Sequence, residues 1–442
     1  MSSAPLTEKR FAVPFVLVTS LFFLWAIGVN LNDILIPHLK KAFSLTDFQS
    51  SLIQSAFFGG YFLAALPAGW LMQRLGYKKG ILIGLCICAT GAFLFIPAAS
   101  VRLYGFFLFA LFVMACGQCF LEVAANPYVT ILGPRESSER RLNFAQSFNS
   151  VGAVVTPFLG AAFILSGIEH TPAELAAMSP AQLSAYQAAE ANMVRAPYLA
   201  ITGIFLCVAL LIYFSSLPEI HESEGSSASA GRTQPERPKM KDVLRRGHLV
   251  KGVIAQFFYV GAQVGVASFI IRFAEHSIPG THEKVAARYL QAHMLGFMIG
   301  RFGGSALMKK IAPSRLLGIF AAGSLVCLAI ILSATGRVPV WAIVLVGFFH
   351  SIMFPTIFAL SLKDLGPATK LGSSLLVMSI IGGAIVPAIM GRISDATDIQ
   401  KAFIVPLICH AYVLYFALRG YKHVPETKLS VSSVVAMDTL DS

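Results

Sequence analysis

The chain has 442 residues, of which 56% are hydrophobic and 13% are charged, and its formal net charge is +12. Soluble domains are typically about 25% charged, so this chain has too few charges to cover the surface of a soluble protein of its size. The Lys and Arg residues lie between long apolar runs and form no basic stripe, which argues against nucleic-acid binding and for loop charges that orient the chain in a membrane.

About twelve apolar runs are long enough to cross a bilayer, which requires roughly 20 residues each. We therefore expect an all-α membrane protein with twelve transmembrane helices, six in each half, joined mostly by short loops. In chain order the expected spans are 12–37, 49–73, 80–99, 104–132, 142–166, 197–217, 249–274, 286–308, 316–334, 341–362, 371–392 and 401–419.

A polar linker, 218–248, separates a first half, 1–217, from a second half, 249–442. The linker is rich in Gly and Ser and then in Lys and Arg, so we expect it to be flexible and cytoplasmic. Lys40 and Lys41 in the first outer loop are an exception, but the total of loop Lys and Arg residues favours this orientation and predicts that both termini are cytoplasmic. The longest outer loop, 167–195, is rich in Ala and Glu and is expected to contain a short surface helix.

The two halves resemble each other at corresponding positions. The fifth and eleventh spans each follow a Gly-Pro turn, at Gly133-Pro134 and Gly366-Pro367, and each reaches a proline at nearly the same spacing, Pro157 and Pro387. Duplicated six-helix halves are typical of transporters whose substrate site lies near the bilayer midplane between the halves. The sequence therefore predicts two pseudo-symmetric halves around a central cavity.

Two acidic residues, Asp33 and Glu122, lie within predicted spans. A carboxylate at a helix centre costs about 2.5–3.5 kcal/mol on insertion scales, so such a residue is a candidate for function. Neither has a basic residue within one helical turn, and desolvation then favours a group that gains and loses a proton over a permanent anion. Hydrogen bonding to a neighbouring helix is the structural alternative for both.

Amide side chains accompany these acids at helical spacing. Polar faces in a lipid-embedded helix must meet protein or water, although one amide alone can also serve as an interhelical hydrogen bond. Three such faces together favour a polar cavity. They are formed by Asn30 with Asp33, by Gln118 with Glu122 and Asn126, and by Asn143 with Gln146 and Asn149.

The matching stretches of the second half are less polar. Phe354 precedes the proline of the tenth span, and Gln256, Tyr259 and Gln263 share one face of the seventh. The predicted cavity is therefore polar and acidic on one wall and more apolar and aromatic on the other, as a sugar requires. For Arg301, in the eighth span, we favour a structural tie, that is, a bond to a carbonyl group or a role in a gate, over contact with the substrate.

Other classes of function fit less well. A drug/proton antiporter would need fewer amides, and the linker and tail are too short for the cytoplasmic domain of a non-transporting sugar sensor. The sequence shows neither a nucleophile–base pair nor a metal-ligand cluster. We therefore expect no enzymatic activity, no metal and no cofactor.

Residues 69–79 look like the signature loop of the major facilitator superfamily, with Gln73 where Asp is usual. Further motifs resemble the fucose–galactose–glucose:proton symporter family almost from end to end, and they lie at 30–35, 53–57, 122–127, 142–150, 259–263 and 300–302. The resemblance implies a symporter of the bacterial inner membrane that moves a sugar inward with a proton and works as a monomer.

The family positions imply that Asp33 and Glu122 couple the proton and that Asn30, Gln146 and Asn149 lie near the sugar. Glu122 is typical of the fucose branch, whereas Phe354 stands where that branch has Tyr, and the segment 351–356 is closer to the glucose/galactose branch. We expect L-fucose as the substrate, with glucose or galactose as the alternative.

Overall fold

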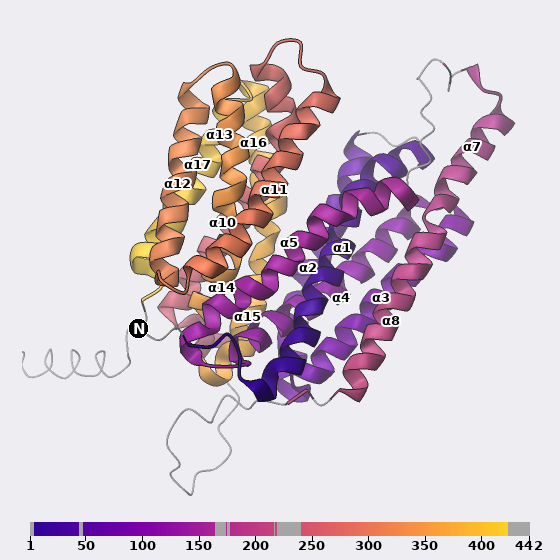
Figure 1. The fold of residues 1–442 in the computed structure, drawn as a ribbon. Helices are drawn as coiled ribbons and strands as arrows, with labels where there is room; N and C mark the ends of the chain where they lie inside the picture. The colour runs from indigo at the N-terminus through magenta and orange to yellow at the C-terminus, as the bar shows by residue number, and fades with distance from the viewer. Residues whose placement is uncertain are drawn as a thin grey trace, which may run out of the picture.

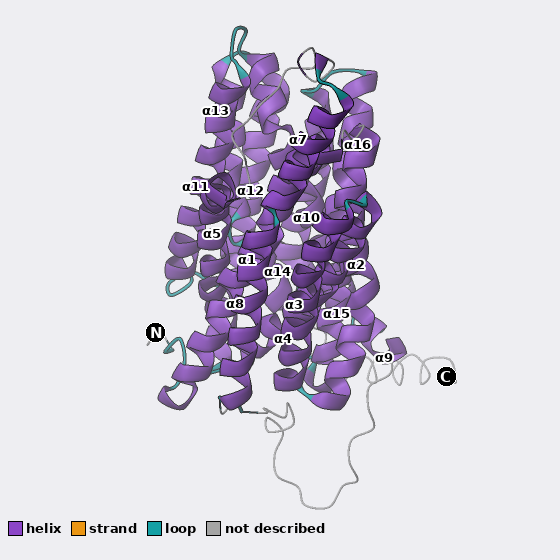
Figure 2. Cartoon of the chain, turned by 90° about the vertical axis from the view of Figure 1, so that its right-hand side faces the viewer, coloured by secondary structure: helices purple, strands orange, loops and turns teal. Residues whose placement is uncertain are grey.

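The computed structural model describes residues 4–43, 47–163, 174, 177–215, 217–218 and 240–422. Every regular element in this part of the chain is a helix (Figure 1, Figure 2). Within the described residues, ten stretches are long and apolar enough to cross a membrane. Two further helices, α5 and α11, have 26 and 25 residues and carry more polar side chains, and both exceed the roughly 20 residues that a span requires. The predicted all-α, twelve-span fold is confirmed.

The first half contains the first six spans and one surface helix. The helix α7 (Pro180–Met193) is the short helix predicted in the outer loop, and it begins with a capping box in which Ser179 and Gln182 each bond the other's backbone N–H. The spans are α1 (Ala12–Phe43), α2 (Asp47–Leu75), α3 (Tyr77–Val101), α4 (Tyr104–Ile131), α5 (Ser138–Phe163) and α8 (Arg195–Phe214).

The second half differs from the expectation in that its tenth and eleventh spans are each divided into two helices. Pro355 near the start of the second piece has no N–H to donate, and this interrupts the helical hydrogen-bond ladder. The helices of this half are α10 (Gly247–Ser277), α11 (Glu283–Leu307), α12 (Pro313–Ser333), α13 (Arg337–His350), α14 (Met353–Leu362), α15 (Thr369–Met378), α16 (Gly382–Ala396) and α17 (Ile404–Tyr415).

The two halves approach each other in the lower part of Figure 1 and diverge toward the top. The helix α5 packs on α11 and α14, and α15 packs on α2 and α4. Ion pairs also join the halves at this closed end, between Glu139 and Lys363 at 3.2 Å and between Arg135 and Asp364. The structure is therefore closed at one end of the interface between the halves.

The described ends of the predicted linker lie at the closed end, where the short helix α9 (Met240–Leu244) packs on α15 and the Pro218 carbonyl accepts a hydrogen bond from Tyr128. Most of the linker, 219–239, is outside the described residues. The N-terminal segment 4–8 also packs at this end, where the Ala4 carbonyl accepts a hydrogen bond from Arg140 at 2.8 Å and the Leu6 carbonyl accepts one from Arg141 at 3.0 Å.

Candidate functional site

The centre of the site is the buried polar stripe of α4. Gln118, Glu122 and Asn126 are four residues apart and therefore share one face of the helix, and none of the three is more than 3% exposed. The Glu122 carboxylate faces the Tyr61 hydroxyl and the Asn126 amide, and the charge of Arg301 acts on it from the other half. A carboxylate in this position can hold a proton and can also accept hydrogen bonds from sugar hydroxyls.

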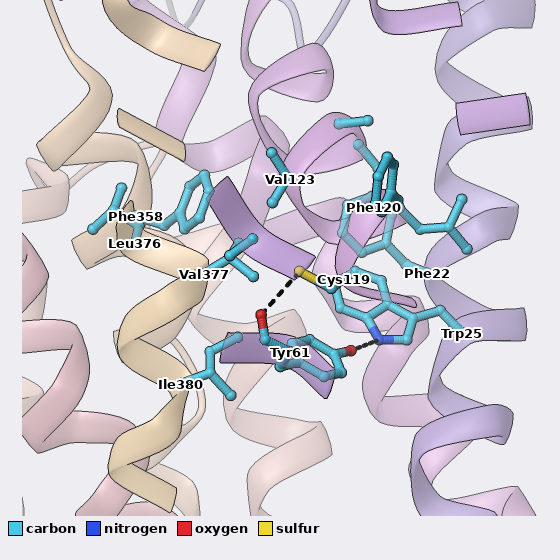
Figure 3. Close-up of a cluster of buried hydrophobic side chains, with 14 of the residues drawn as sticks. Phe22, Trp25, Tyr61, Cys119, Phe120, Val123, Phe358, Leu376, Val377 and Ile380 are labelled. Carbon is cyan, nitrogen blue, oxygen red and sulfur yellow. Dashed lines mark hydrogen bonds between the residues drawn. The ribbon is translucent and has the colours of Figure 1, made fainter. Parts of the chain in front are cut away.

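Tyr61 on α2 is held in place from two sides (Figure 3). Its hydroxyl oxygen accepts a hydrogen bond from Trp25 Nε1 at 3.1 Å, and its backbone carbonyl accepts one from the Cys119 thiol at 3.3 Å. The hydroxyl hydrogen of Tyr61 therefore remains available to Glu122. Sequence reasoning missed both Tyr61 and Trp25, because aromatic residues are common in spans and the sequence does not show which of them face the acid.

A hydrogen-bonded chain continues from the α4 stripe to the second half. Gln146 on α5 donates from Nε2 to Asn126 Oδ1 at 2.9 Å, and its own oxygens accept from Arg301 on α11. Arg301 Nη1 lies 2.7 Å from the Gln146 carbonyl and 3.1 Å from Gln146 Oε1. The acid, two amides and a buried arginine thus form one polar group across the interface between the halves.

Two prolines at corresponding positions provide anchor points for such contacts. A proline within a helix leaves the carbonyl four residues earlier without its usual partner. Pro355 leaves the Ser351 carbonyl free, and this carbonyl accepts from Arg301 Nε at 2.7 Å. Pro127 leaves the Val123 carbonyl free, and this one accepts from Ser373 Oγ at 2.9 Å across the halves. The predicted structural tie of Arg301 to a carbonyl is therefore present.

The second-half candidates gather at the same break between α13 and α14. The Tyr259 hydroxyl donates to the His350 carbonyl at 2.8 Å, and Tyr259 is fully buried. Phe354 is 8% exposed and stacks on Phe358 with ring centroids 6.0 Å apart. Gln256 lies one turn from Tyr259 and is also fully buried, whereas Gln263 is half-buried.

Asn30 and Asn149 lie at the contact between α1 and α5, within the first half. The Asn149 amide donates to the Phe22 carbonyl at 3.3 Å, and Asn30 donates to the Ala26 carbonyl of its own helix at 2.7 Å. Phe22, Ala26 and Asn30 are spaced by four residues along α1 and therefore share one face of the helix. The side chain of Asp33, the second predicted acid, lies outside the described residues.

Several buried amides of the site have hydrogen-bonding atoms that no protein group pairs. They include both amide atoms of Gln118 and both of Gln256. Unpaired buried polar groups are costly and usually find a ligand or water partner. The amides therefore provide donors and acceptors that suit a neutral, hydroxyl-rich ligand.

The chain matches the sequence model of the Major Facilitator Superfamily over residues 18–391. It is 45% identical over 412 residues to the L-fucose-proton symporter of Escherichia coli strain K12, covering 93% of both chains. It is 43% identical over 417 residues to a glucose/galactose transporter of Brucella abortus, covering 94% of this chain and 96% of that one.

Among solved structures, the fold is similar to the Escherichia coli fucose:proton symporter FucP, with a TM-score of 0.85 and 44% identity over 94% of this chain and 100% of that chain. A second structure of FucP, in the outward conformation, is similar to the same extent.

Proposed function

The chain belongs to the Major Facilitator Superfamily, and we propose that it is a proton-coupled sugar importer and not an enzyme. L-fucose is the substrate that we propose, and galactose or glucose is the second candidate because the two kinds of relative are almost equally similar in sequence. The observation that carries the proposal is the buried Glu122, which shares one face of α4 with the unpaired amide of Gln118 and on which the charge of Arg301 acts from the opposite half.

The sugar site that we propose lies between the two halves. The amides Gln146, Asn149 and Asn30 would contact sugar hydroxyls from the first half. Gln256, Tyr259, Gln263 and Phe354 would face the sugar from the second half, with the Phe354 ring against its C–H face.

Glu122 would bind the proton that accompanies the sugar. Because a protonated carboxyl both donates and accepts hydrogen bonds, proton and sugar would each strengthen the binding of the other. Protonation would also remove the attraction between the Glu122 carboxylate and the Arg301 guanidinium, which weakens the polar group that joins the halves. Asp33 would be the second group on the proton path.

We propose that the halves 1–217 and 249–442 rock about this site and that the closed end is cytoplasmic, as are both termini. Import would then require the cross-half contacts to break. These contacts include the Arg301–Gln146 bonds, the Ser373–Val123 bond and the bond from Asn143 Nδ2 to Thr356 Oγ1 at 3.0 Å. The protein would do this as a monomer in the bacterial inner membrane, with the proton as coupling ion and no other cofactor.

The test is counterflow uptake in proteoliposomes with a panel of labelled sugars. L-fucose should be taken up in exchange for internal unlabelled L-fucose and should be blocked by excess unlabelled substrate. If galactose or glucose is exchanged in preference to L-fucose, the proposed substrate is wrong and the proposed mechanism stands. Failure to exchange any sugar, with proton-driven extrusion of a cationic dye in its place, would indicate a drug/proton antiporter.

A further inference from the structure

A cavity of about 430 Å³ lies at the closed end, away from the proposed sugar site. Its walls come from three parts of the chain: the N-terminal segment 4–6, Arg140 and Phe144 on α5, and Phe302 and Ser305 on α11 with Lys309 in the turn after it. Ligand pockets commonly have volumes of about 300–1,000 Å³, so the cavity is large enough for a small organic molecule.

The two charged side chains that line this cavity, Arg140 and Lys309, are both cationic. Arg140 is 8% exposed, and its Nη2 donates to the Ala4 carbonyl at 2.8 Å while its Nε has no hydrogen-bond partner. Its neighbour in sequence, Glu139, is paired with Lys363. None of the described residues that line the cavity is acidic.

Much of the remaining wall is aromatic. Phe144 contacts Phe15 of α1 and Phe148 of its own helix, with ring centroids 6.1 and 5.6 Å apart. Phe148 in turn contacts Phe302 of α11 at 6.2 Å. An aromatic cluster therefore fixes this wall and continues from the first half into the second. A ligand for the cavity needs an anionic group for the two cations and an apolar part for the rings.

We propose that this cavity binds an organic phosphate and that the bound phosphate holds the closed end shut. Phosphate suits a guanidinium with a free N–H and a nearby ammonium, and basic pockets between membrane helices are known to bind phospholipid headgroups. A phospholipid of the adjacent leaflet and a soluble phosphate ester would present the same group to Arg140 and Lys309.

The effect on transport follows from the position of the cavity, and this part of the inference rests on the proposed importer. Arg140 and Phe144 belong to one half, and Phe302 and Lys309 belong to the other. A ligand that needs both walls binds only while they are together, so it stabilises the closed end by mass action. At a ligand concentration about 100 times the dissociation constant, opening of this end becomes about 100-fold less favourable.

Binding is tested on the full-length protein in neutral maltoside micelles, which contain no phosphate, by following the thermal unfolding midpoint. Glycerol 3-phosphate represents the soluble source and phosphatidylglycerol the lipid source. The proposal expects at least one of them to raise the midpoint. The shift should be lost in Lys309→Gln and kept in the matched control Lys310→Gln, whose exposed side chain is adjacent in sequence but does not line the cavity.

The transport arm uses vesicles of phosphate-free galactolipid. L-fucose counterflow is measured with no phosphate, with glycerol 3-phosphate on both sides, and with phosphatidylglycerol in the bilayer. The probe that binds should slow wild-type counterflow at least fivefold and should leave Lys309→Gln unchanged. Absence of a midpoint shift with both probes, or an equal shift in both Lys variants, would overturn the site. A midpoint shift without slower counterflow would overturn the proposal that the ligand holds the closed end shut. Sugar counterflow measured without phosphate tests the proposed importer function separately from the phosphate site.

Discussion

The bonds from Arg301 to Gln146 form a charge-assisted contact between the halves near the proposed proton site. Replacing Arg301 by Gln removes the donor that lies 2.7 Å from the Gln146 carbonyl and 3.1 Å from its Oε1. A hydrogen bond to a charged group contributes about 1.5–3 kcal/mol, and both acceptors share one nitrogen, so we count a single such contribution. The hydrogen bond from Arg301 to the Ser351 carbonyl lies within the second half, so its loss does not by itself favour separation of the two halves. The variant should therefore shift the equilibrium toward opening of the closed end by about 10- to 150-fold.

The shift can be measured by double electron–electron resonance between spin labels at Glu136 and Lys310. Both side chains are exposed, and they lie on opposite halves near the closed end. Arg301→Gln should populate longer distances that are rare in the wild-type protein. Arg272→Gln is the matched control, because Arg272 stacks on Phe269 at 4.5 Å within one half. Identical distance distributions for Arg301→Gln and wild type would refute the idea that this contact holds the halves together.

Three further variants test other parts of the account. Gly69→Ala should destabilise the closed end, because a Cβ there would lie against Ser374 and 2.9 Å from the Lys370 carbonyl; unchanged label distances would contradict this. Phe354→Ala should weaken the apparent sugar affinity by about 1–2 kcal/mol, which is a rise of about 5- to 30-fold in the half-saturation concentration. An unchanged half-saturation concentration would mean that Phe354 only packs on Phe358. Asp33→Asn should retain sugar exchange and lose accumulation against a gradient, and loss of both would indicate a packing role.

The helices were predictable because the bilayer imposes their length and composition. The apolar runs predicted every span, and Pro355 provided a visible signal for the break that divides α13 from α14. The break itself was not predicted, because a proline in a membrane helix can be accommodated with or without separating the helix into two pieces. The acid Glu122 was also visible, since an unpaired carboxylate in an apolar run is rare.

The partners of these residues depend on tertiary arrangement and left no local signal. Arg301 and Gln146 are 155 residues apart, and their contact exists only because α11 packs on α5. Helical spacing placed Asn143, Gln146 and Asn149 on one face. It did not show that the first two contact the other half while Asn149 contacts α1.

The claim that Glu122 couples proton and sugar movement is tested most directly by sugar-driven proton uptake. Wild-type protein and Glu122→Gln are reconstituted in parallel, and L-fucose is added outside while the external pH is recorded. The Gln variant retains a side-chain acceptor for sugar hydroxyls but cannot release a proton, so exchange of labelled for unlabelled L-fucose should persist. The account predicts that L-fucose alkalinises the external medium with the wild-type protein and leaves the pH unchanged with the variant. Wild-type alkalinisation by Glu122→Gln would contradict it.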